Sequence, residues 1–181
     1  MKRRVFYCDG SSRPIEGGIR CGWAVSMQTH SGAHFVMSDE VIAEKGSDRR
    51  ELSSAAKTNN VGELTAFLMT LRCVEDWCKK GETVVIRPDS QYVIKGLITE
   101  HTGTMVSSDG RTTFPSGWMR GWLKNDWTNS KNEPVKNKEL WLELLKVGRR
   151  LSGRITVEIE WVKGKTCEEA LIVDRYAKGL Q

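Results

Sequence analysis

The sequence predicts a mixed α/β domain, in which a strand meander is followed by further strands joined through helices. Two segments carry this prediction. Residues 155–162 (ITVEIEWV) alternate apolar and polar side chains, which is typical of a half-buried strand. Residues 82–88 (ETVVIRP) form a nearly continuous apolar run, which is typical of a central strand buried on both faces. Amphipathic segments separate and follow these strands, so the predicted order is three strands, a helix, a strand, helices, a strand and a helix.

The first part of the chain predicts three strands, at residues 5–8, 22–27 and 33–42. The first run, VFYC, meets Asp9 and Gly10, a turn signal that we expect to close the strand. Residues 43–58 are polar and charged, and they predict a long exposed loop or a short extra helix.

Helical spacing becomes strong after residue 58. Asn60 is a candidate N-cap with Glu63 three residues later, which is the capping-box pattern, and the amphipathic run ends near Gly81. Further helices are predicted at residues 90–99, 138–151 and 168–178, the last closed by Gly179. Residues 102–117 lack helical period and contain an Asp109-Gly110 pair, which suggests a small hairpin.

Length and composition indicate one globular domain with an anionic partner. The chain has 181 residues, 39% hydrophobic and 28% charged, and its 28 Lys and Arg against 23 Asp and Glu give a net charge of +5. A basic balance favours nucleic acid. Five cysteines without a C-x-x-C spacing predict reduced thiols and a cytoplasmic location, and no apolar run is long enough to cross a membrane.

Four carboxylates are the candidate chemical groups: Asp9, Glu63, Asp89 and Asp174. Each alone has a structural explanation, in chain order a turn, a capping box, a helix N-cap and an i,i+4 ion pair with Lys178. Together they would suit a hard, oxygen-preferring cation such as Mg²⁺, which indicates phosphodiester hydrolysis.

The strings around these acids occur in a specific order: DGS (9–11), TNN-x-x-EL (58–64), DSQYV (89–93), PVKN followed by LW (134–141), and EWVKG (160–164). In this the chain resembles the ribonuclease H type 1 (ribonuclease HI) family, enzymes that cut the RNA of RNA–DNA hybrids. The resemblance implies a ribonuclease H-like α/β fold, a mixed five-stranded sheet of order 3-2-1-4-5 with helices on both faces. The resemblance covers about 150 of the 181 residues. It implies a single domain over residues 1–181, with insertions at 43–57 and 102–117 and a basic, Trp-rich handle at 118–137.

By the same resemblance, Asp9, Glu63, Asp89 and Asp174 hold two Mg²⁺ ions, or Mn²⁺, and the products carry 5′-phosphate and 3′-hydroxyl ends. The resemblance also implies contacts to the substrate. RNA-strand contacts are expected from Gly10, Ser11, Asn59, Asn60 and Gln91, a DNA-phosphate contact from Thr58, and handle contacts from Trp118, Trp122 and Lys124.

One position departs from the family pattern. Lys165 stands where the family often has a histidine near the metals. A lysine with an ordinary pKa near 10.4 is a poor proton acceptor at neutral pH, so we expect Lys165 to assist at the phosphate and turnover to be slower.

Three functions remain open at this point. The leading one is a monomeric, metal-dependent endoribonuclease acting on RNA–DNA hybrids, with no membrane partner. The others are a catalytically weak or inactive hybrid-binding module, and a DNA-cleaving nuclease on the same fold. The presence of all four acids favours the enzyme, and the TNN-x-x-EL and handle strings favour the hybrid over DNA.

Overall fold

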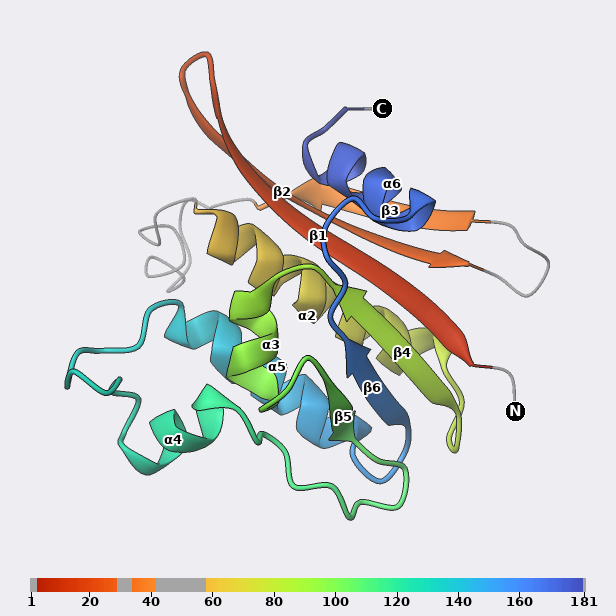
Figure 1. Cartoon of the computed structure of the whole chain (residues 1–181), viewed down its shortest axis with the longest axis vertical. Coiled ribbons are helices and arrows are strands. Elements are labelled where there is room, and N and C mark those ends of the chain that lie inside the picture. The colour runs from red at the N-terminus through yellow and green to blue at the C-terminus, as the bar shows by residue number, and fades with distance from the viewer. Residues whose placement is uncertain (1–2, 29–33, 42–57, 181) are drawn as a thin grey trace.

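The chain forms a mixed sheet with helices on both faces (Figure 1). A computed structural model describes residues 3–28, 34–41 and 58–180. The predicted insertion at 43–57 therefore lies outside the described residues. The elements are β1 (Arg4–Ile15), β2 (Gly18–Gln28), β3 (His34–Glu40), α2 (Asn59–Trp77), β4 (Thr83–Pro88), α3 (Gln91–Leu97), β5 (Thr102–Val106), α4 (Trp118–Lys124), α5 (Lys138–Leu151), β6 (Thr156–Glu160) and α6 (Glu168–Ala177).

The sheet has six strands in the order β3-β2-β1-β4-β6-β5. Strands β1, β2 and β3 form the predicted antiparallel meander, and β4 joins β1 in parallel. Strand β6 pairs in parallel with β4, so the order 3-2-1-4-5 is confirmed for the five predicted strands. The α/β class is confirmed, and the strand count of five is too low by one.

The additional strand is β5, within the segment predicted to be an insertion with a hairpin. Residues Thr102–Val106 pair antiparallel with β6 and form the edge of the sheet. Asp109 and Gly110 lie in a turn after the strand, where Gly110 has φ +69° and its N–H donates to the Ser107 carbonyl. The hairpin prediction was wrong because the partner of this strand is β6, more than 50 positions further along the chain.

Strand β1 is also longer than predicted. It continues through Asp9 and Gly10, which pair with Ala24 and Trp23 of β2, and ends at Ile15. The reversal comes instead at Gly17, whose φ of +83° is favourable only for glycine. Asp9 is therefore held inside a paired strand, which fixes its backbone more firmly than a turn would.

The two faces of the sheet differ in their cover. Helix α2 contacts β1, β2 and β4 on one face, and α5 packs against α2 and β5 in the main core. Helix α6 lies on the opposite face over β1, β2 and β3, where its Val173 and Ala177 pack with Tyr7 and Ala24 of the sheet (Figure 1). The predicted helices on both faces are thus confirmed. None of the described helices has the length and apolar character needed to cross a bilayer.

Candidate active site

Three of the four acids converge where β1, β4 and α2 meet. Carboxylate oxygens of Asp9, Glu63 and Asp89 all lie within 4.8 Å of one another. Strands β1 and β4 run in parallel with Cys8 opposite Pro88, so Asp9 and Asp89 follow at the same level of the sheet. Pro88 is the last residue of β4, which suits a residue that lacks a backbone N–H.

Glu63 reaches this cluster because α2 begins earlier than predicted. The N-cap is Thr58, whose side chain accepts a hydrogen bond from the N–H of Val61, so the predicted cap at Asn60 was wrong. Without a capping box to complete, the Glu63 carboxylate is free to point at β1. Its Oε2 accepts from the Gly10 N–H at 3.2 Å, and Asn59 Nδ2 donates to Oε1 at 3.4 Å.

Asp89 follows β4 and is not the N-cap of the next helix. That role belongs to Ser90, whose side chain accepts from the N–H of Val93. The Asp89 backbone is fixed by Trp161, whose indole Nε1 donates to its carbonyl at 2.7 Å. Among the described residues, Asp89 Oδ1 is buried and has no hydrogen-bond partner. A buried carboxylate oxygen without a donor is unfavourable unless a cation completes it.

Asp174 lies on α6, outside this group of three. Its carboxylate contacts Lys178 Nζ, at 2.6 Å from Oδ1 and 2.8 Å from Oδ2, so the i,i+4 ion pair is present. Lys165 Nζ lies 3.9 Å from Oδ2. Asp174 is still close enough to act electrostatically on Asp9 and Asp89, since its charge contributes to raising the pKa of both.

The acids carry strongly perturbed pKa values. Burial, and then the charges of Asp89 and Asp174, raise the pKa of Asp9 to about 7. Burial followed by the charge of Asp9 raises the pKa of Glu63 well above its ordinary value, and burial also raises that of Asp89. Three crowded carboxylates with only oxygen donors and an unpaired buried oxygen fit a hard divalent cation, which would remove their mutual repulsion.

Comparison with known proteins agrees with this geometry. A sequence model of the RNase H family matches residues 1–180. The chain belongs to the RNase H family. A ribonuclease H of Neorickettsia sennetsu is 31% identical over 183 residues, 98% of this chain and 92% of the relative. A ribonuclease H of Pelobacter propionicus is 38% identical over 112 residues, 62% of this chain, and there the match spans about half (53%) of the relative's length.

The fold agrees as well. The crystal structure of LC11-RNase H1 in complex with an RNA/DNA hybrid superposes with a TM-score of 0.55 at 16% identity, covering 99% of this chain and 100% of the other. At that identity the likeness concerns the RNase H fold alone.

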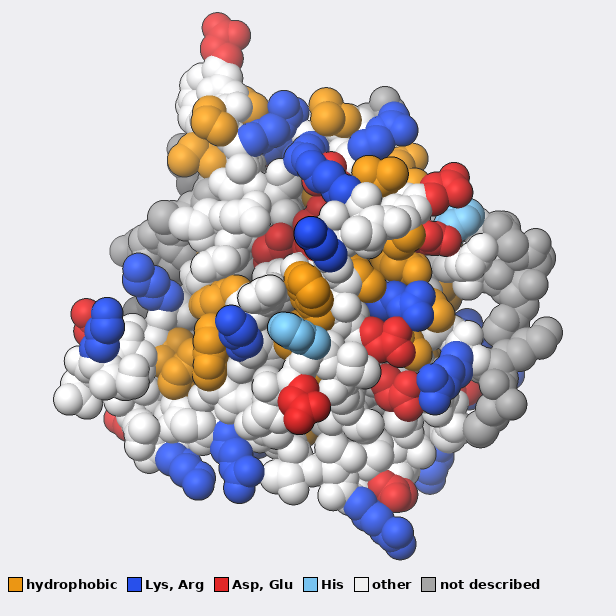
Figure 2. Space-filling model, viewed as in Figure 1, with side chains coloured by type: hydrophobic (Ala, Val, Ile, Leu, Met, Phe, Trp, Pro, Cys, Tyr) orange, Lys and Arg blue, Asp and Glu red, His pale blue; other side chains and the backbone are white. Residues whose placement is uncertain are grey.

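The residues expected to contact substrate lie close to the acids along the chain. Gly10 follows Asp9, Ser11 is buried next to it, and Asn60 and Gln91 are exposed at the starts of α2 and α3. Asn59 and Thr58 have internal roles, because Asn59 Oδ1 accepts from the Ser12 N–H and Thr58 caps α2. On the face in Figure 2, acidic side chains near the middle lie among scattered lysine and arginine side chains.

The predicted handle borders a groove together with α3. Helix α4 and the chain after it border a cavity of about 700 Å³, lined among others by Lys95, Ser116, Trp118, Trp122, Asn125 and Asn129. The two tryptophans differ. Trp122 packs on the fully buried Trp141 with ring centroids 5.3 Å apart, whereas Trp118 is 45% exposed. Lys124 is exposed at the end of α4.

Sequence reasoning missed two contributors to this RNase H site. Gly62 lets α2 approach β1, and Trp161 fixes the backbone of Asp89. Trp161 stands within the EWVKG string, which was the available signal. The contact of Gly62 with β1 has no local signature, because it joins segments about 50 residues apart.

Proposed function

We propose that this protein is a metal-dependent endoribonuclease that hydrolyses the RNA strand of RNA–DNA hybrids to 5′-phosphate and 3′-hydroxyl ends. The observation that supports this most is the convergence of Asp9, Glu63 and Asp89 within 4.8 Å in a chain of the RNase H family. The hybrid as substrate is supported by the names of the ribonuclease H relatives and by the hybrid held in the LC11-RNase H1 crystal structure.

The residues proposed to hold the cations are Asp9, Glu63 and Asp89, with Asp174 at the border of the cluster. Bound Mg²⁺ or Mn²⁺ would supply Lewis-acid activation of the water and stabilisation of the leaving 3′-oxygen. The protein orients these ligands: Gly10 N–H and Asn59 hold Glu63, and Trp161 holds Asp89. Because the ligands are fixed before the substrate binds, little reorganisation is needed at the reaction.

Substrate positioning is assigned to the surrounding residues. Gly10, Ser11, Asn59, Asn60 and Gln91 are proposed to meet the RNA strand, where contacts to 2′-hydroxyls would distinguish RNA from DNA. The groove with Trp118 and Trp122 is proposed to hold the other part of the hybrid through stacking, and Lys124 at the end of α4 is proposed to contact a phosphate. Thr58 is proposed to lie at a DNA phosphate.

Lys165 is proposed to act on the phosphate as a fixed positive charge. It is exposed, its φ is +65°, and its ammonium group lies 3.9 Å from Asp174. Next to it, Gly164 leaves room for the Asp89 carboxylate, since a Cβ there would lie 2.7 Å from Oδ2. The loop therefore brings a cation close to the acids without covering them.

The test is cleavage of a labelled RNA–DNA hybrid with Mg²⁺, compared with EDTA and with duplex DNA, duplex RNA and single-stranded RNA. Metal-dependent cutting of only the hybrid's RNA strand, abolished by Asp9→Asn, is expected. Tight binding without cutting would favour the hybrid-binding module, and cutting of duplex DNA would favour the DNA nuclease.

A further inference from the structure

The carboxylate of Asp174 is shared between two lysines of this chain. Lys178, one turn later on α6, contacts both oxygens, at 2.6 Å and 2.8 Å. Lys165 approaches Oδ2 to 3.9 Å from the loop before α6. The Asp174 side chain is only 18% exposed, so water screens these contacts less than it would at an open surface.

The other three acids have a different environment. Within the part of the chain that the structure describes, no lysine or arginine nitrogen lies within 4.0 Å of a carboxylate oxygen of Asp9, Glu63 or Asp89. The donors to Glu63 among the described residues are neutral, namely Gly10 N–H and Asn59 Nδ2. The four acids thus divide into three that lack a protein cation and one that already has two.

We propose that Lys178 competes with divalent cations for Asp174, and that it is the positioning residue that makes cation binding at Asp174 weaker than binding within the group Asp9, Glu63 and Asp89. The inference rests on the proposed function, because it requires these acids to bind metal. A cation that uses Asp174 must displace an ammonium group from both oxygens and then remain close to it. Two effects weaken its binding: the cation has to replace the attraction between the ammonium group and the carboxylate, and the displaced ammonium group then repels it.

The competition predicts two binding steps of unequal strength. The stronger step depends on Asp9, and the weaker one depends on Asp174. Removing the charge of Lys178 should strengthen the weaker step by at least roughly tenfold, which is what one unit charge about 6 Å from a divalent ion contributes even at the dielectric constant of water. Lys165 is more exposed and 3.9 Å away, so its removal should have a smaller effect in the same direction.

The test is calorimetric titration of the metal-stripped protein with Ca²⁺ and with Mn²⁺, in wild type and Lys178→Met. We expect the weaker step to tighten at least roughly tenfold in Lys178→Met, or to become detectable if wild type shows only one step. Asp174→Asn should remove this step from both proteins. A weaker step that is unchanged or weakened in Lys178→Met would overturn the proposal.

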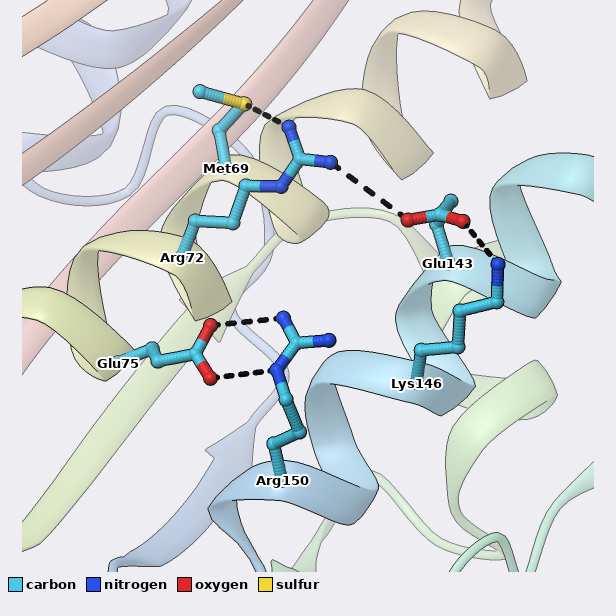
Figure 3. Close-up of polar contacts among 6 residues, drawn as sticks. All are labelled: Met69, Arg72, Glu75, Glu143, Lys146 and Arg150. Carbon is cyan, nitrogen blue, oxygen red and sulfur yellow. Dashed lines mark hydrogen bonds and ion pairs between the residues drawn. The ribbon is translucent and has the colours of Figure 1, made fainter.

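The matched control is Lys146→Met. Lys146 makes a similar contact with Glu143, 2.7 Å and three residues apart on α5, and Glu143 also pairs with Arg72 of α2 rather than belonging to the four acids (Figure 3). The Lys146→Met variant removes the same charge from the protein as Lys178→Met does, and it should leave both metal-binding steps unchanged. If Lys146→Met tightens binding as much as Lys178→Met does, the effect is one of net charge and the proposal fails.

Two further variants separate the possible failures. If Lys178→Met does not fold, as judged by its thermal transition, Lys165→Met tests the same competition from outside the helix and should tighten the weaker step severalfold; no change would overturn the proposal. Asp9→Asn tests the proposed function itself. Loss of the strong step in Asp9→Asn with no response to the lysine variants would reject only the competition. A strong step that survives Asp9→Asn would reject the metal assignment.

Discussion

Oε2 of Glu63 accepts a hydrogen bond from the backbone N–H of Gly10 at 3.2 Å, and this contact joins α2 to β1 at the centre of the acidic cluster. It is possible because helix and strand touch through glycine. A Cβ added to Gly10 would clash with the backbone of Gly62 and Glu63. The distance between Asp9 and Glu63 is therefore set by a backbone-to-backbone contact, which side-chain motion cannot relax.

Gly10→Ala should separate α2 from β1 and disrupt the metal site. Since the clash is with backbone atoms, we expect a loss of about 2–4 kcal/mol in the free energy of unfolding and at least a 100-fold loss of activity. Urea denaturation and hybrid cleavage measure the two effects. Gly103→Ala is the control, because its Cβ would meet only Ile98 Cδ1 at an ordinary 3.5 Å. Near-wild-type activity of Gly10→Ala would show that the approach is not required.

The metal-free protein should lose stability as the pH rises from 5 to 8. The pKa of Asp9 is about 7 in the folded chain and near 3.9 when unfolded, so the folded state binds a proton that the unfolded state has released. Its contribution is fully present below about pH 4 and is lost as the pH rises through 7. The raised pKa values of Glu63 and Asp89 act in the same direction.

Urea denaturation in EDTA at pH 5 and pH 8 measures this loss, which we expect to be on the order of a few kcal/mol. The Asp9→Asn variant should lose less free energy of unfolding between the two pH values. Adding Mg²⁺ to the wild-type protein at pH 8 should restore its stability. A wild-type protein that is more stable at pH 8 than at pH 5 in EDTA would contradict the perturbed acids.

The order of the elements was predictable because local patterns determined it. The alternation at 155–162 and the apolar run at 82–88 identified β6 and β4, and helix α5 has the predicted bounds Lys138–Leu151. Strand β5 was missed because an edge strand in a Thr- and Gly-containing segment has no clear alternation, and its pairing with β6 is not local.

The site was predictable by residue type, while its internal arrangement was not. The motif strings pointed to four acids, of which the structure brings Asp9, Glu63 and Asp89 together. A spacing of N-x-x-E could not distinguish a capping box from a carboxylate pointing across to β1. The structure answers this through Thr58, which caps α2 and leaves Glu63 free. Likewise, the sequence presented the Asp174–Lys178 ion pair and a metal ligand at Asp174 as alternatives. The structure contains the ion pair, and the proposed competition would allow both.

A network of ion pairs joins α2 to α5 and should stabilise the fold without affecting catalysis (Figure 3). Arg150 binds Glu75 through two contacts of 2.7 and 2.9 Å. The Arg150 side chain is 52% exposed, so we expect Arg150→Met to lower the free energy of unfolding by only about 0.5–1 kcal/mol, with the loss shrinking at high salt.

The ion pair of Arg150 and Glu75 should also respond to pH. The hydrogen bond from Arg150 lowers the pKa of Glu75, so the stabilisation from this pair is present at neutral pH and disappears as the pH falls through the pKa of Glu75 in the folded state. Arg111→Met is the control, because Arg111 meets Asp109 at 3.7 Å with 88% of its side chain exposed, and its loss should be near zero. Equal losses for the two variants would show that the α2–α5 pair has no special role.

The two handle tryptophans should separate binding from folding. Trp118 is exposed at the groove, so Trp118→Ala should weaken binding of an RNA–DNA hybrid by about 1–3 kcal/mol, the value of one stacked base, with little change in melting temperature. Trp122 packs on Trp141, so Trp122→Ala should lower the melting temperature as well. Fluorescence anisotropy at several salt concentrations measures binding.

The lysines of the handle should set the salt dependence of hybrid binding. The double variant Lys124→Gln, Lys131→Gln should reduce the slope of log affinity against log salt by an amount that corresponds to the loss of up to two phosphate contacts, and Trp118→Ala should leave that slope unchanged. If the lysine variants leave the slope unchanged, the handle does not contact phosphates, and if Trp118→Ala binds as wild type does, the groove is not where bases stack.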